Sequence, residues 1–195
     1  MGDNFWNDAA KGGAIIGLVY IILSQVSIQL DLSPIAGMTY VMLTLLIFLA
    51  KCAGLLTVEI VFTKKRKVLY PEGFGFSQAF TFIAGMMLLG GFIYGVWFAI
   101  VEARLMLPTY IESQFAALDK MLAVAPQVEQ LLGPDYLDVI GSYRPSIISV
   151  VFSSTLSMLL AGGFFGLFVS AGLRTRLNPF ANMPPRQEDD NNGNE

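Results

Sequence analysis

The sequence contains no histidine, and Cys52 is its only cysteine. A disulfide within one chain needs two cysteines, and a Cys/His zinc site needs several ligands of these two kinds. A Ser-His-Asp triad and a Cys-His dyad each need a histidine. The inventory therefore excludes all four kinds of site.

Charged residues are also scarce. They make up only 14% of the 195 residues, against about a quarter in ordinary soluble domains, while 54% of the residues are hydrophobic. This composition excludes a soluble cytosolic enzyme, a nucleic-acid binder and a disordered protein. The net charge of −3 by itself indicates no polyanionic partner.

Long apolar runs replace the missing charge, and they predict an all-α membrane protein. The hydrocarbon core of a bilayer is about 30 Å thick and needs about 20 apolar residues of helix. The predicted spans lie at about 12–30, 34–62, 74–102 and 146–173. The first run is expected to be a retained span rather than a signal peptide, because no small-x-small cleavage site precedes Asp31.

The spans divide the chain into three parts. We expect a cytoplasmic N-terminus over 1–11, a four-span membrane domain over 12–176, and a cytoplasmic tail over 177–195. The tail is wholly polar near its end, which is typical of disorder.

The charges beside the spans predict their orientation, because Lys and Arg concentrate in cytoplasmic loops. The segment 103–145 between the third and fourth spans is mostly acidic. Both termini are therefore expected in the cytoplasm, with 103–145 outside. The basic residues that follow the second and fourth spans are Lys64, Lys65, Arg66, Lys67, Arg174 and Arg176.

The outer segment contains an amphipathic helix. After Pro108, which suits the first turn of a helix, apolar residues recur at helical spacing with charges between them. Pro126 is expected to kink or divide this helix. The apolar stripe has two interpretations: it packs on the tops of the spans or lies in the interface, which we favour, or it is a docking surface for a partner.

Small residues at four-residue spacing predict close packing between spans. In lipid, helices associate through close backbone approach, which small side chains permit. We expect the third and fourth spans to pack tightly and the first to join them, although the same faces also suit a homo-oligomer. The predicted packing residues are Gly13, Gly17, Gly91, Gly95, Ala99, Ala103, Ser153, Ser157, Ala161, Gly162 and Gly166.

Two ionisable residues, Lys51 and Glu59, lie within the apolar stretches, and such residues are the usual indication of function. We expect Lys51 to snorkel to the inner surface, with a role in transport as the alternative. Glu59 lies two turns further on, too far away to contact Lys51 directly. The run from Lys64 to Lys67 is expected to face lipid, where it sets the topology or attracts anionic lipid at the cytoplasmic face.

No catalytic, cofactor or metal site is predicted. The acids are scattered over the outer segment and the tail, whereas acid-base catalysis needs acids that converge in a cleft. No phosphate-binding Gly-Lys-Ser loop is present. We therefore expect no enzyme, no cofactor and no nucleic-acid partner.

The order of these features is also informative. The basic inner loop is followed by Gly73–Phe80 (GFGFSQAF) at the start of the third span, and the fourth span ends in Arg174-Thr175-Arg176. With the polar first span and the acidic outer helix, this plan resembles a family of bacterial membrane proteins over about residues 10 to 176. The family is the domain of unknown function 4199, found mainly in Bacteroidetes-type bacteria.

The family has no established activity and so supplies no functional residues. Its members are sometimes encoded near polyprenyl-phosphate glycosyltransferases. The resemblance therefore implies an inner (plasma) membrane protein with an accessory role in envelope or glycan assembly.

The sequence as a whole predicts a non-catalytic accessory subunit or scaffold that contacts the lipid bilayer and a membrane protein partner. The alternative is a small transporter or channel component that uses Lys51. A third class, a lipid-modifying enzyme, would require a polar cleft with at least two converging acids.

Overall fold

The computed structural model describes residues 4–70, 73–128, 142 and 146–175, and helices account for most of them. The π-helix η1 (Phe98–Leu105) continues α3 directly, and the 3₁₀ turn η2 (Pro126–Val128) follows α4. The predicted disordered tail lies outside the described residues. The α-helices are α1 (Phe5–Leu32), α2 (Gly37–Lys67), α3 (Phe76–Trp97), α4 (Leu107–Val124) and α7 (Ile147–Leu173).

Four helical stretches are long and apolar enough to cross a membrane: α1, α2, α7 and the stretch Phe76–Val101. The helix α4 lies between the third and fourth of them. The predicted all-α fold with four spans and a helix between the third and fourth spans is thereby confirmed. The spans also carry exposed apolar side chains, such as Phe48 and Phe152, as expected for surfaces in contact with lipid.

The first two helices are longer than a bilayer requires. With 28 and 31 residues, α1 and α2 are about 42 Å and about 46 Å long at a rise of 1.5 Å per residue. The helix α2 continues past Phe62 through the whole basic run to Lys67. Cations in the last turn of a helix are favoured by its dipole, so this run stabilises the helix end.

Local sequence explains where the other helices begin and end. The Gln78 side chain accepts a hydrogen bond from the Gly75 amide at 2.9 Å, and Ser146 Oγ accepts one from the Ser149 amide at 3.1 Å. These bonds fix the starts of α3 and α7. Pro108 lies in the first turn of α4. This helix ends at Val124, just before Pro126, where the sequence predicted a kink or a break.

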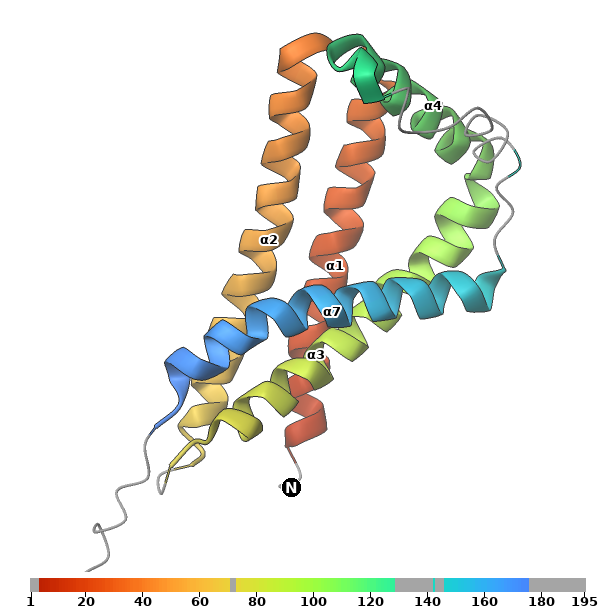
Figure 1. Ribbon diagram of the computed structural model, residues 1–195. Helices are drawn as coiled ribbons and strands as arrows, with labels where there is room; N and C mark the ends of the chain where they lie inside the picture. The colour runs from red at the N-terminus through yellow and green to blue at the C-terminus, as the bar shows by residue number, and fades with distance from the viewer. Residues whose placement is uncertain (1–3, 71–72, 129–141, 143–145, 176–195) are drawn as a thin grey trace, which may run out of the picture.

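The four spans form two pairs that meet at one end and diverge at the other (Figure 1). The helices α1 and α2 run side by side, while α3 and α7 cross them obliquely and pack along each other. The ends of α2 and α7 and the starts of α1 and α3 define the basic end of the bundle. The helix α4 bridges the two pairs at the opposite end, which we name the α4 end.

Candidate functional site

Glycines bring α1, α3 and α7 into close contact. A Cβ atom on Gly13 would lie 2.7 Å from the Met86 carbonyl oxygen, and one on Gly17 would lie 3.0 Å from Ile93 Cγ2. Both contacts join α1 to α3. The predicted glycines of the first span therefore lie at an interface with the third span, where any larger side chain would force the helices apart.

The contact between α3 and α7 follows the same principle. A Cβ atom on Gly91 would lie 2.8 Å from Thr155 Cα, and one on Gly95 would lie 3.0 Å from the Val151 carbonyl oxygen. From the other side, Gly166 faces Ile83, and Gly162 lies against the Met87 side chain. Ala99 is fully buried, whereas the side chain of Ala103 lies outside the described part of the chain.

Three of the predicted packing residues lie elsewhere. Ser153, Ser157 and Ala161 are exposed and do not form the interface with α3. The neighbouring stripe of α7, with Gly162, Gly166 and the buried Ser170, packs instead. The small residues of α7 form two stripes, and only one of them can face α3.

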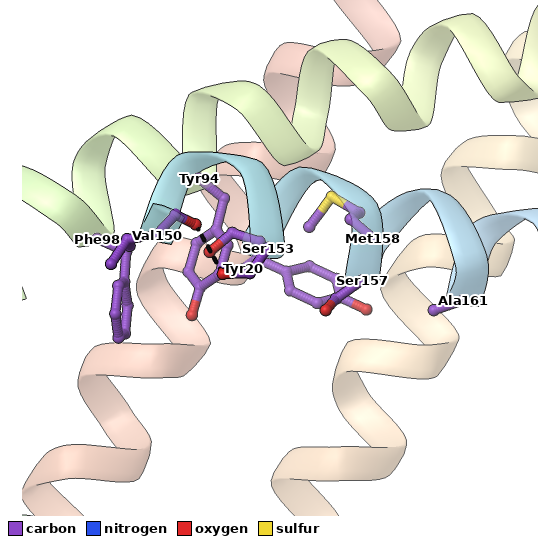
Figure 2. A pocket seen from close by; sticks show the side chains of 9 residues that line it. Tyr20, Tyr94, Phe98, Val150, Ser153, Ser157, Met158 and Ala161 are labelled. Atoms are coloured by element: carbon purple, nitrogen blue, oxygen red, sulfur yellow. Dashed lines mark hydrogen bonds between the residues drawn. The ribbon is translucent and has the colours of Figure 1, made fainter. Parts of the chain in front are cut away.

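The exposed serine stripe lines an open cavity of about 410 Å³. Two tyrosines form its opposite wall, Tyr20 from α1 and Tyr94 from α3, with ring centroids 6.0 Å apart. Figure 2 shows both tyrosine rings and the Ser153 and Ser157 side chains gathered on one side of α7. The cavity is therefore rich in hydroxyl groups, although it lies within the span region. We name it the hydroxyl cavity.

Near the basic end, polar side chains of α2 point into the bundle. Glu59 and Thr63 are fully buried, and Arg66 is 4% exposed. Neither Glu59 carboxylate oxygen has a hydrogen-bond partner, and the same holds for Thr63 Oγ1 and for Ser170 Oγ of α7. Buried polar groups are normally hydrogen-bonded, so these four atoms are exceptional. We name Glu59, Thr63, Arg66 and Ser170 the polar core.

Arg66 links this core to the start of α1. Its Nη1 lies 3.5 Å from Asp8 Oδ2, and its Nη2 donates to the Tyr70 hydroxyl at 3.3 Å. The guanidinium also lies over the Phe5 and Phe82 rings, at 5.5 and 5.9 Å from their centroids. These contacts combine a charge pair with cation–π attraction in a largely dry site.

The burial of Arg66 corrects one expectation. The sequence predicted that the whole run from Lys64 to Lys67 faces lipid, but only Lys64 and Lys65 are exposed, and Lys67 is half-buried. An α-helix has 3.6 residues per turn, so four consecutive residues cannot all share one face. Arg66 is the one that points inward. Lys51 is half-buried in the structure, as is Cys52.

At the α4 end, one lysine fastens α4 to the end of α1. Lys120 Nζ donates hydrogen bonds to the carbonyl oxygens of Leu30, Asp31 and Ser33 at 3.0, 2.6 and 2.7 Å. These carbonyls belong to the last turn of α1 and its cap, where no further helical turn supplies amide donors, although the Leu30 carbonyl also accepts from the Ser33 amide and hydroxyl. The same ammonium lies 4.9 Å from the centroid of the Tyr40 ring, and the Tyr40 hydroxyl donates to Asp31 at 2.8 Å. We name this arrangement the Lys120 clamp.

Beside the clamp, α2 and α4 enclose a groove of about 770 Å³. Its walls are mainly apolar and include Leu45 and Phe48 of α2 with Ala117, Leu118 and Met121 of α4. The apolar stripe of α4 thus packs partly on the spans and partly lines this groove. Docking of a partner on this stripe stays a prediction.

No cluster of three or more histidine, cysteine, aspartate or glutamate side chains is close enough to hold a metal ion in the part of the chain that the structure describes. Among known families, the one described as "Protein of unknown function (DUF4199)" matches residues 11–175. No curated protein and no solved structure matches the chain significantly.

Proposed function

Since the chain belongs to the DUF4199 family of proteins of unknown function, we propose a function from its own geometry: a non-catalytic accessory or scaffold subunit. It lies in the inner membrane of a bacterium, with both termini in the cytoplasm and α4 outside. Its partner is a membrane protein of a cell-envelope or glycan-assembly complex. The absence of histidine from the sequence supports a non-catalytic role.

The Lys120 clamp is the observation that carries the proposal. An amphipathic helix outside the spans is commonly loose, but here three short hydrogen bonds hold α4 against α1. Hydrogen bonds that involve a charged group each contribute about 1.5–3 kcal/mol. The clamp therefore presents α4 in one fixed position, and a surface that is ordered before binding loses less entropy when a partner docks.

The groove between α2 and α4 is the docking surface of the proposal. It runs from the span region of α2 to the outer helix, so it suits a transmembrane helix of the partner. The exposed Lys64 and Lys65 support the orientation, because basic residues concentrate on the cytoplasmic side and attract anionic lipid there.

Filling the groove tests this function. We expect Ala117→Trp to abolish copurification of the partner in mild detergent, because the indole occupies the space that the partner helix needs. The matched control is Ala123→Trp, at an exposed position of α4 that does not line the groove. It should retain the partner. A strictly monomeric wild-type protein, or equal recovery of the partner with both variants, would refute the scaffold.

A further inference from the structure

Glu59 is a carboxylic acid inside the membrane bundle with no partner of its own. Its side chain is fully buried, and neither oxygen has a hydrogen bond. On α2 it lies between the buried residues Leu55 and Thr63, and on α7 it faces Gly162, at whose position a Cβ would lie 3.3 Å from Glu59 Oε1.

Of the basic residues of α2 on either side of Glu59, Lys64 and Lys65 are exposed, and Arg66 and Lys51 act on other acids. Arg66, two turns toward the basic end, pairs with Asp8. The charge of Lys51, two turns toward the α4 end, acts on Asp31. The helices α3 and α7 carry no acidic or basic residue within their bounds. On α1, Lys11 is exposed, and Tyr20 is close enough to Glu59 for an electrostatic interaction.

An ionised Glu59 carboxylate is energetically unfavourable in these surroundings. Burial of an isolated charge without a compensating partner is strongly unfavourable, whereas burial of a neutral carboxylic acid is far less so. Ionisable residues inside spans are accordingly rare and tend to have functions. The neutral form of Glu59 is therefore the form that fits the closed bundle.

On α7, adjacent residues line the hydroxyl cavity and contact Glu59. Met158 and Ala161 line the cavity, and the next residue after Ala161 is Gly162, which faces Glu59. Tyr20 also lines the cavity and is close enough to Glu59 for an electrostatic interaction, but it does not hydrogen-bond to Glu59. A water molecule occupies about 30 Å³ of liquid, so a cavity of about 410 Å³ with five hydroxyl-bearing residues accommodates several ordered waters.

We propose that Glu59 is a proton-binding site in the interior of the bundle and that protons reach it through the hydroxyl cavity. The ligand is a proton delivered by water. Toward the basic end, the unpartnered Thr63 hydroxyl and the Arg66–Asp8 pair continue the row of polar groups beyond Glu59. This site goes beyond the scaffold function and stands independently of it.

Infrared spectroscopy tests the protonation. The full-length protein in lipid vesicles at pH 7 should show the C=O stretching band of a protonated carboxyl group, and Glu59→Gln should lack that band. Glutamine matches the neutral acid in shape, so the variant should keep the thermal midpoint of the wild type. Absence of the band from the wild type, or its persistence in Glu59→Gln, would overturn the proposal.

Dicyclohexylcarbodiimide tests the same state chemically. The proton of a neutral carboxyl group moves to one carbodiimide nitrogen while the carboxyl oxygen bonds to the central carbon. A shift of the acyl group to nitrogen then yields a stable N-acylurea with no leaving group. Mass spectrometry at pH 7 should find this adduct on Glu59 and not on the exposed Glu112 of α4. Equal labelling of the two residues would contradict a specific proton site.

The route is tested by blocking the cavity. Ser157→Trp fills the hydroxyl cavity, and Ser149→Trp places the same side chain at an exposed position of α7 outside the cavity lining. After a pH jump, the infrared band of Glu59 should respond at least threefold more slowly in Ser157→Trp than in the wild type. In Ser149→Trp it should respond at the wild-type rate. Equal rates in all three proteins would refute entry through the cavity.

Discussion

A Cβ atom at Gly91 would lie 2.8 Å from Thr155 Cα, closer than real Cβ atoms approach a backbone atom. The helices α3 and α7 therefore pack so closely that the hydrogen atom of Gly91 fits between them but a Cβ methyl group would not. At Gly163, one residue after the buried Gly162, no atom lies within 4 Å of a built Cβ. Gly91 thus lies on a packed face of α3, whereas Gly163 lies on an open face of α7.

This difference yields a prediction at the residue scale. Gly91→Val should destabilise the folded protein by about 1–3 kcal/mol, the usual cost of forcing extra atoms into a packed interface. Gly163→Val, with the same change in helix propensity, should cost clearly less. Thermal unfolding of both variants in one detergent measures the difference. Equal midpoints would show that the α3–α7 contact does not depend on Gly91.

The sequence predicted the glycine faces well but not which stripe of α7 is used. Ser153 and Ser157 repeat every four residues as regularly as Gly162 and Gly166 do, so spacing alone cannot rank the two stripes. The choice depends on α3, whose Met87 and Ile83 fill the space over the glycines. In the sequence, Glu59 stands out only as a partner for Lys51. Its importance depends on its burial against α7, which no local sequence pattern reveals.

At the scale of the element, α4 owes its position to Lys120. Its amphipathic pattern predicted the helix and a kink or division at Pro126, and the structure ends α4 at Val124. The pattern could not predict the clamp, because the carbonyl groups that Lys120 contacts lie 87 to 90 residues earlier in the chain. Every residue has a backbone carbonyl, so the sequence does not single out these three. Only the fold brings them together around Lys120 Nζ.

Removing the clamp should loosen α4 without unfolding the spans. In Lys120→Met, the amides of Leu107–Val124 should exchange hydrogen for deuterium at least tenfold faster, since 1.4 kcal/mol corresponds to a factor of about ten and each charge-assisted bond contributes about 1.5–3 kcal/mol. Exchange in α3 should stay unchanged. Lys64→Met, at an exposed position, is the control. Equal exchange of α4 in the two variants would contradict the role of the clamp.

At the scale of the whole molecule, the four spans do not form a closed cylinder. The pair α1–α2 and the pair α3–α7 meet near the basic end and separate toward the α4 end (Figure 1). The hydroxyl cavity is lined by α1, α3, η1 and α7, whereas the groove is lined by α2, α4 and Ala125. The proposed docking surface and the proposed proton site can therefore be altered separately.

The orientation of the whole molecule is also testable. In a Cys52→Ala background, Arg104→Cys should react with a membrane-impermeant maleimide in cells whose outer membrane has been permeabilised. Lys64→Cys should react only after the inner membrane is opened, because the basic end is expected to face the cytoplasm. Both residues are exposed in the structure, so burial does not limit either reaction. The reverse pattern would invert the proposed topology.

The Lys120 clamp also imposes an order on biosynthesis. Leu30 leaves the ribosome 90 residues before the lysine that binds its carbonyl oxygen. The last carbonyls of α1 therefore lack this partner when α1 is synthesised, and they gain it only once α4 has folded against them. Docking of α4 thus completes the end of α1, and a chain truncated before Lys120 would lack all three of these hydrogen bonds.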